Sequence, residues 1–104
     1  MRRAPTPNDL KGEFLSAVAN SNRLQVLQIL GRGEIPVGRL AMEVGLSQSA
    51  LSQHLAKLRA SDLVKTRRDA QTIYYSIKSE RVHQILQALA QMFDDTSSQL
   101  KAAS

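Results

Sequence analysis

Residues 40–59 read LAMEVGLSQSALSQHLAKLR, and this stretch predicts two short helices joined by a tight turn. Gly45 lies where the first helix should end, since glycine tolerates the positive φ that many helix ends require. Ser47 is placed to cap the second helix, because its hydroxyl can accept from a backbone N–H two or three residues later. Leucines recur at i, i+4 and i+7 as one buried face of that helix: Leu51, Leu55 and Leu58. The stretch therefore predicts a helix-turn-helix.

The opposite face of the second helix is polar but uncharged. It carries Gln48, Ser49, Ser52 and Gln53. Short side chains with donors and acceptors suit base edges in a DNA major groove, where a bidentate Gln–adenine contact adds about 1–3 kcal/mol of discrimination. The alternative is an ordinary solvated helix face. The position of these residues, after the turn and ahead of a basic segment, favours the base-contacting role.

The composition favours a polyanionic partner. The 104 residues fit one domain and include 14 Lys and Arg against 9 Asp and Glu, a formal net charge of +5. The chain has no cysteine, which excludes disulfides, thiolate metal sites and thiol redox switching. No apolar run approaches the length of a membrane span, and residues 1–7 lack the apolar core of a signal peptide. We therefore expect a cytoplasmic protein with no membrane partner.

Two helices are predicted ahead of the helix-turn-helix. The first follows Asn8, a candidate cap, and ends near Asn20. The second follows a candidate cap at Ser21 and continues to Leu30. Residues 34–37 form a short extended link, because the residue before a proline is disfavoured in the α region.

A hairpin is predicted after the helix-turn-helix, since the apolar period changes from 3.6 to 2. Residues 63–68 and 72–77 are strand-like and flank a turn at 69–71. Because strand side chains alternate between faces, one of Tyr74 and Tyr75 should pack inward while the other can reach a phosphate. The expected inner set is Ile73, Tyr75 and Ile77. A helix-turn-helix followed by such a hairpin is a winged helix.

Ser79 is placed to cap a last helix whose apolar face is too broad for this small domain to cover. Pairing with a second copy, together with the first helix, would cover it. The expected dimer contacts are Leu10, Phe14, Leu15, Val82, Ile85, Leu86, Leu89, Met92 and Phe93. The predicted fold is mostly α (α+β), with five helices and a two-stranded wing, dimerising through the first and last helices.

The two ends of the chain differ from its middle. Residues 1–7 hold two Pro and two Arg and predict a disordered arm, while residues 96–104 are polar and predict a frayed tail. Residues 8–95 are expected to form one domain that serves both DNA binding and dimerisation.

Cations gather on the second helix of the motif and on the hairpin. Together with nearby polar groups they predict phosphate and wing contacts at Ser47, His54, Lys57, Arg59, Lys65, Arg67, Arg68, Gln71, Thr72 and Tyr74. The alternative is an ordinary charged surface, and Arg67 and Arg68 could instead enter the minor groove. His54 could equally pack at the helix interface with a hydrogen bond. For Arg23 we favour a structural ion pair over DNA contact.

Three segments together resemble the ArsR/SmtB family of bacterial repressors: ANSNRL at 19–24, VGLSQSALSQHL at 44–55 and RRDAQTIYYS at 67–76. The likeness extends from about residue 10 to residue 95, and the wing is most similar to the rhizobial nodulation repressor branch. The resemblance implies a dimeric winged-helix transcriptional repressor.

Many members of that family sense metals or sulfur species, and the resemblance indicates where their ligands would fall. A Cys-x-Cys pair falls on Pro36 and Gly38, neither of which can bind a metal. The second site falls on Ser79, Arg81, Met92 and Asp95, and the sulfur-sensing cysteine falls near Gln28. One carboxylate is not a site, so no metal or other cofactor is expected.

The favoured hypothesis is a homodimer that places its recognition helices in successive major grooves of an imperfect palindrome in double-stranded DNA. The rival is a winged-helix module that binds another protein through its apolar last helix and does not use DNA. An enzyme is the weakest option, because no nucleophile with a base, Gly-rich phosphate loop or usefully spaced carboxylate pair is present.

Overall fold

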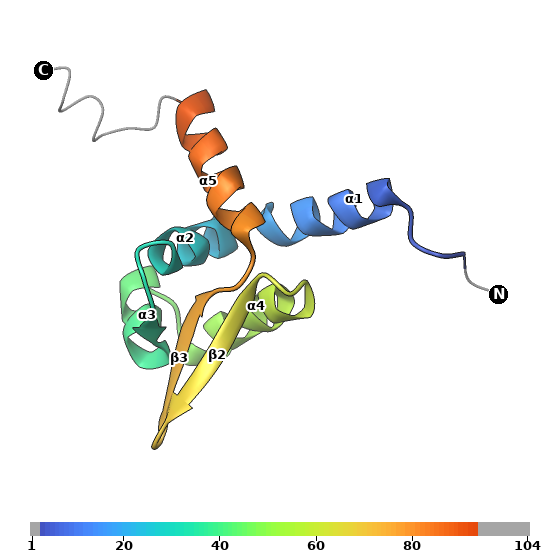
Figure 1. Ribbon diagram of the computed structural model, residues 1–104. Helices are drawn as coiled ribbons and strands as arrows, with labels where there is room; N and C mark the ends of the chain where they lie inside the picture. The colour runs from blue at the N-terminus through green and yellow to red at the C-terminus, as the bar shows by residue number, and fades with distance from the viewer. Residues whose placement is uncertain (1–2, 94–104) are drawn as a thin grey trace, which may run out of the picture.

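The computed structural model describes residues 3–93, which form five helices and a three-stranded antiparallel sheet (Figure 1). The elements in chain order are α1 (Pro7–Val18), α2 (Ser21–Leu30), β1 (Ile35–Pro36), α3 (Val37–Val44), α4 (Gln48–Ala60), β2 (Val64–Asp69), β3 (Thr72–Ile77) and α5 (Glu80–Met92). The predicted winged helix-turn-helix is confirmed. The predicted tail at 96–104 lies outside the described residues.

The helix-turn-helix follows the sequence pattern closely. Gly45 ends α3 with a φ of 79° and donates its N–H to the carbonyl of Ala41 at 2.9 Å. Ser47 caps α4, and its Oγ accepts from the Ala50 N–H at 3.1 Å. The three predicted leucines of α4 are all at most 1% exposed. The turn and cap predictions are therefore confirmed.

One core joins the helices to the sheet, with α2 contributing most to it. Its largest fully buried side chains are Leu27, Leu30, Leu40, Leu51, Leu55, Leu58, Val26 and Val82. Val82 was predicted to lie in a dimer interface, but it is 0% exposed within a single chain. That assignment is wrong, because the first turn of α5 packs against the core before the helix projects outward.

The first two helices begin earlier than the sequence suggested. Thr6 caps α1 in place of Asn8: its side chain accepts from the Asp9 N–H at 3.0 Å, and the Asp9 carboxylate accepts from the Thr6 N–H at 2.9 Å. This reciprocal capping box satisfies two backbone donors, whereas a cap at Asn8 would leave them open. Asn20 caps α2 in place of Ser21 by accepting from the Arg23 N–H at 3.0 Å.

The sheet has one strand more than the predicted hairpin. Its order is β1-β3-β2, and the extended link expected at 34–37 contributes β1, which pairs with Tyr74 and Tyr75 of β3. Strands β2 and β3 pair from Val64↔Ile77 to Asp69↔Thr72. Tyr75 is buried at 5% exposure, which confirms the predicted inner set, and Ile73 and Ile77 pack against the core.

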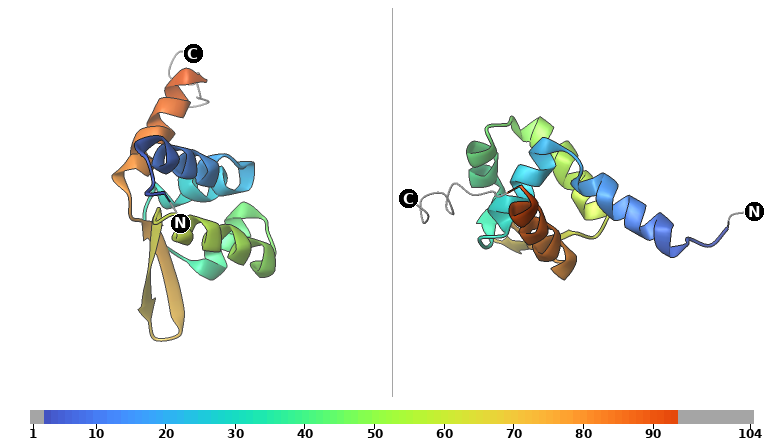
Figure 2. Two further views of the ribbon diagram at one scale, coloured as in Figure 1. Left: turned by 90° about the vertical axis from the view of Figure 1, so that its right-hand side faces the viewer. Right: turned by 90° about the horizontal axis from the view of Figure 1, so that it is seen from above.

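The first and last helices project away from the wing (Figures 1 and 2). Leu10 and Leu15 of α1 are more than half exposed, and so are Met92 and Phe93 at the end of α5. These apolar side chains have no cover within residues 3–93. No helix in that range is long and apolar enough to cross a membrane.

Candidate nucleic-acid interface

The predicted base-contacting residues lie together on the exposed side of α4. Gln48, Ser49, Ser52 and Gln53 are all exposed. They occupy the first two turns of the helix, directly after the Ser47 cap. Within residues 3–93 their side chains make no hydrogen bond, so their donors and acceptors are available to an external partner. The leucines on the opposite side of α4 fix the orientation of this polar face.

His54 follows these residues and is half-buried. A packed histidine was expected to make a hydrogen bond at the helix interface, yet the described part of the chain offers it none.

Arg59, predicted to contact a phosphate, is directed at the sheet instead. Its Nη1 donates to the hydroxyl of Tyr75, and its guanidinium carbon lies 5.9 Å from the centroid of the Tyr75 ring. Tyr75 is the inner tyrosine, so this contact joins the last turn of α4 to β3. Lys57 of the same helix is exposed and has no acidic partner among residues 3–93.

The wing divides its cations between two faces. Arg68 pairs with Ile73 in the register of the hairpin and so shares the inner face with Tyr75, toward α4. Arg67 pairs with Tyr74, and Lys65 is two residues away on the same outer face. The cations that the sequence grouped together therefore point in opposite directions.

Arg67 is bound on this outer face by Glu34, which sequence reasoning did not identify. Its Nε and Nη2 donate to the two carboxylate oxygens at 3.0 and 2.8 Å, and its guanidinium lies 4.5 Å from the centroid of the Tyr74 ring. The hydrogen bond from Arg67 lowers the pKa of Glu34, with a further contribution from the charges of Arg67 and Lys65. The pKa of Arg67 is raised by the same hydrogen bond. Glu34 and Arg67 are 33 residues apart, and no local pattern in the sequence links them.

Arg23 has the structural role that was favoured, although its partner is not an acidic side chain. Its Nε donates to the carbonyl of Ala17 at 2.6 Å, and its Nη2 donates to the carbonyl of Ser16 at 3.1 Å. The predicted ion pair is wrong because the C-terminal carbonyls of α1 carry enough partial negative charge to hold the guanidinium.

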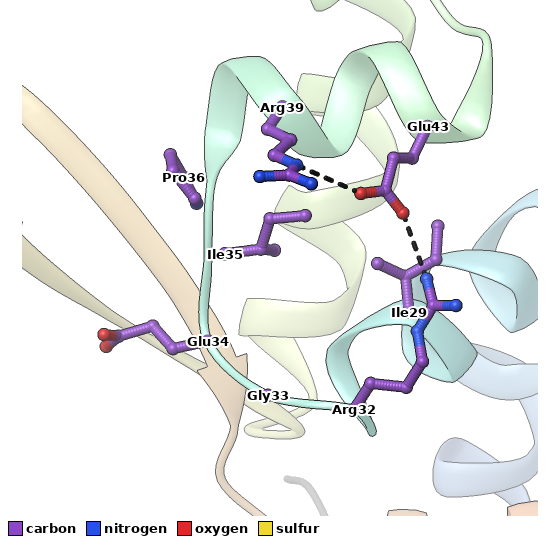
Figure 3. A pocket seen from close by; sticks show the side chains of 8 residues that line it. All are labelled: Ile29, Arg32, Gly33, Glu34, Ile35, Pro36, Arg39 and Glu43. Atoms are coloured by element: carbon purple, nitrogen blue, oxygen red, sulfur yellow. Dashed lines mark hydrogen bonds and ion pairs between the residues drawn. The ribbon is translucent and has the colours of Figure 1, made fainter.

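A pocket of about 380 Å³ lies where the end of α2, β1 and α3 meet (Figure 3). Glu43 accepts from Arg32 at 3.0 Å and from Arg39 at 3.3 Å, and this triad forms one side. Glu34 also lines the pocket, but its carboxylate points away from the triad (Figure 3). The Glu43 carboxylate thus accepts from two arginines at the pocket, while the Glu34 carboxylate accepts from Arg67 on the wing.

Within residues 3–93, the positions on which the family resemblance placed metal ligands have structural roles or are exposed. Pro36 belongs to β1, Gly38 is exposed, and Ser79 caps α5 by accepting from the Arg81 N–H at 3.2 Å. Asp95 lies outside the described residues. Residues 3–93 contain no group of three or more His, Cys, Asp or Glu side chains that could hold a metal ion.

The remaining predicted dimer residues fall into two groups. Exposed apolar side chains are Leu10, Leu15, Met92 and Phe93. Half-buried ones are Phe14, Ile85, Leu86 and Leu89, of which Phe14 and Leu86 also pack against the core. Both groups come from α1 and from α5 with its C-cap Phe93, so each of these two helices carries apolar side chains that the chain itself leaves at least partly uncovered.

Known proteins resemble this chain in sequence and in structure. Residues 20–66 match the family model described as "Bacterial regulatory protein, arsR family". The nodulation protein NolR of Rhizobium meliloti is 59% identical over 87 residues, which cover 84% of this chain and 71% of that protein. The crystal structure of NolR from Sinorhizobium fredii has a TM-score of 0.81 and 51% identity, and the match covers 92% of this chain and 100% of that chain.

A further solved structure shares the architecture at lower identity. It is the solution NMR structure of the Mycobacterium bovis domain Mb0332, described as a homodimeric winged helix-turn-helix DNA-binding domain. Its TM-score is 0.77 at 31% identity, and the match covers 84% of this chain and 81% of that chain.

Proposed function

The chain belongs to the arsR family of bacterial regulatory proteins, and we propose that it is a homodimeric transcriptional repressor that binds an imperfect palindrome in double-stranded DNA. The family resemblance seen in the sequence is thereby confirmed. Proteins of this family regulate transcription, so the chain is a regulator and not an enzyme.

The observation that carries the proposal is the exposed polar face of α4. Gln48 and Gln53 each present an amide that can bond bidentately to adenine, and the two serines between them can bond to any base. None of these side chains makes a hydrogen bond within residues 3–93. We assign base recognition to these four residues.

We assign phosphate contacts to exposed or half-buried polar groups of α4, its cap and both faces of the wing. They are Ser47, His54, Lys57, Lys65, Arg68, Gln71, Thr72 and Tyr74. Arg59 and Arg67 are left out because Tyr75 and Glu34 already hold them. Such contacts position the protein on the duplex and make its affinity dependent on salt.

Binding to a palindrome requires a protein with twofold symmetry, and a homodimer has that symmetry. A twofold dimer through α1 and α5 would carry twice the net charge of +5 and present two copies of α4 to one side of the DNA. Its half-sites are expected about one helical turn apart or slightly more. Bound at a promoter, the dimer would prevent polymerase from binding.

The test begins by selecting bound duplexes from a random DNA pool, followed by fluorescence anisotropy over a series of salt concentrations. Gln48→Ala or Gln53→Ala should relax preference at particular base pairs, by about 1–3 kcal/mol each. Arg68→Ala should weaken all sequences alike and reduce the salt slope by about 0.9 for each phosphate that is no longer neutralised. Gln28→Ala, at an exposed glutamine on α2, is the control and should change neither.

Two outcomes would refute the proposal. The first is failure of the wild-type chain to bind even a random duplex at low salt and micromolar protein. That result would refute DNA binding and favour the alternative, a module that binds another protein through the apolar α5. If Arg68→Ala altered base preference without altering the salt slope, the assigned roles of α4 and the wing would be wrong.

A further inference from the structure

The outer face of the wing is tied to a segment far away in the chain. Arg67 of β2 donates two hydrogen bonds to Glu34, which directly precedes β1. Because β3 lies between β1 and β2, the Arg67 side chain reaches across the middle strand, over the ring of Tyr74. The pair therefore spans the full width of the sheet.

We propose that Glu34 is a positioning residue for DNA binding, which acts through Arg67 to fix the wing relative to the helix-turn-helix. This inference rests on the proposed function, because it assigns a role within the same DNA-binding surface. It also gives Arg67 a different role from the phosphate contact that its position in a basic segment suggested.

The main-chain attachment on this side of the wing is weak. Strand β1 has only two residues, and Pro36 offers no N–H to the ladder. The Glu34–Arg67 pair adds two charge-assisted hydrogen bonds next to this short strand. It connects the hairpin to the linker that leads directly into α3.

A second arginine acts on the opposite face of the same strand. Arg59, at the end of α4, donates to Tyr75, while Arg67 covers Tyr74. Adjacent side chains of β3 point to opposite faces, so the two arginines hold the strand from both sides. Arg59 connects β3 to the recognition helix α4, and Arg67 connects it to Glu34, in the segment that leads into α3. The angle between wing and recognition helix thus depends on both contacts.

Two other roles for the pair predict different results. If Arg67 bound a phosphate, Arg67→Ala would reduce the salt slope of DNA binding by about 0.9 for that phosphate. If Glu34 only competed with phosphates for Arg67, Glu34→Gln would strengthen DNA binding by removing a negative charge. A positioning role predicts instead that Glu34→Gln weakens DNA binding, although the loss of a negative charge would by itself strengthen it.

The first experiment measures the affinity of the full chain for a duplex selected from a random pool. Glu34→Gln should weaken binding about two- to fivefold, the range expected for losing an exposed ion pair. Glu43→Gln is the matched control, because it makes the same charge change beside the same pocket but frees Arg32 and Arg39, which are not on the wing. It should leave affinity unchanged or raise it. Unchanged or tighter binding by Glu34→Gln would overturn the proposal.

The second experiment exchanges the two charges. Arg67→Glu alone should weaken binding, and the double variant Glu34→Arg, Arg67→Glu should return to within about twofold of wild type, since the two residues act as a coupled pair. Arg67→Ala should keep the wild-type salt slope, unlike Arg68→Ala. A double variant as weak as Arg67→Glu, or a reduced salt slope in Arg67→Ala, would overturn the proposal. Wild-type protein that bound no duplex would instead refute the proposed function, so the two failures are distinguishable.

Discussion

Gly45 shows how strongly a single backbone angle constrains a residue in this fold. Its φ of 79° falls in the left-handed region, where any residue with a Cβ is strained, although the space around it is open. We expect Gly45→Ala to lower the free energy of unfolding by about 1 kcal/mol. Urea denaturation followed by circular dichroism measures the change.

Gly38 provides the matched control, because it lies within α3, has open space where a Cβ would stand and lacks a positive φ. Gly38→Ala should therefore raise the free energy of unfolding by about 0.5–1 kcal/mol. Equal effects of the two substitutions would contradict the role given to the φ of Gly45.

The Glu34–Arg67 pair predicts a pH dependence of stability. Because the hydrogen bond from Arg67 lowers the folded-state pKa of Glu34 below its ordinary value of 4.5, the pair stabilises the fold fully above that value. The stabilisation is lost as pH falls through the lowered folded-state pKa. We expect wild type to melt at a higher temperature than Glu34→Gln at pH 7, and the difference to vanish in strong acid. A difference that persists there would show that the carboxylate acts in some other way.

For single side chains, the sequence predicted burial wherever burial follows from the local period of a helix or strand. Alternation along residues 72–77 predicted that one of the two tyrosines is buried, and the inner set chosen, with Tyr75, is the one observed; the helical period identified the buried leucines of α4. It could not predict that Arg67 binds Glu34 or that Arg59 binds Tyr75, because both contacts depend on how distant segments fold together. The exposed polar face of α4 could be predicted without such information, since it depends on only one helix.

Among the elements, the contact between α4 and β3 is open to a direct test. Tyr75→Phe removes the hydroxyl that accepts from Arg59 but keeps the buried ring. The variant should lose about 1 kcal/mol of unfolding free energy, the net contribution of a typical hydrogen bond. Thermal or urea denaturation at neutral pH would measure it.

Tyr74→Phe is the control for that experiment, because the hydroxyl of Tyr74 makes no hydrogen bond within residues 3–93 while its ring still lies under Arg67. Its stability should match wild type. If both substitutions destabilise equally, the Arg59 contact is not the cause.

Element boundaries were predicted less well than element types. Thr6 and Asn8 are both residues that cap helices, and so are Asn20 and Ser21, so local preference alone cannot choose between them. The reciprocal bonds between Thr6 and Asp9 decide the first case. Strand β1 was missed because two residues carry no alternation, and its pairing with β3 arises only in the folded sheet.

For the whole molecule, the uncovered apolar side chains of α1 and α5 predict a dimer. Leu10 is 58% exposed, so Leu10→Glu should leave the fold of one chain intact while placing a charge in the proposed interface. We expect the wild-type mass in sedimentation equilibrium to be twice the chain mass of 11.5 kDa, and the variant to shift toward that of a single chain.

Met42→Glu is the matched control, because Met42 is even more exposed, at 81%, but lies on α3, away from the α1–α5 surface. It should remain dimeric. A wild-type chain that sediments as a monomer, or a Met42→Glu variant that dissociates as readily as Leu10→Glu, would place the interface elsewhere.

The composition of the sheet edges has a consequence for aggregation. A thin sheet that protrudes from a small core exposes unpaired main-chain groups on its outer strands, and a strand from another molecule can add to them. Here one edge is a two-residue strand containing Pro36, and the other, β2, carries Lys65, Arg67 and Arg68. Proline offers no donor to an incoming strand, and like charges repel a second copy of β2. The proline of one edge strand and the cations of the other thus oppose edge-to-edge polymerisation of the wing with other wings.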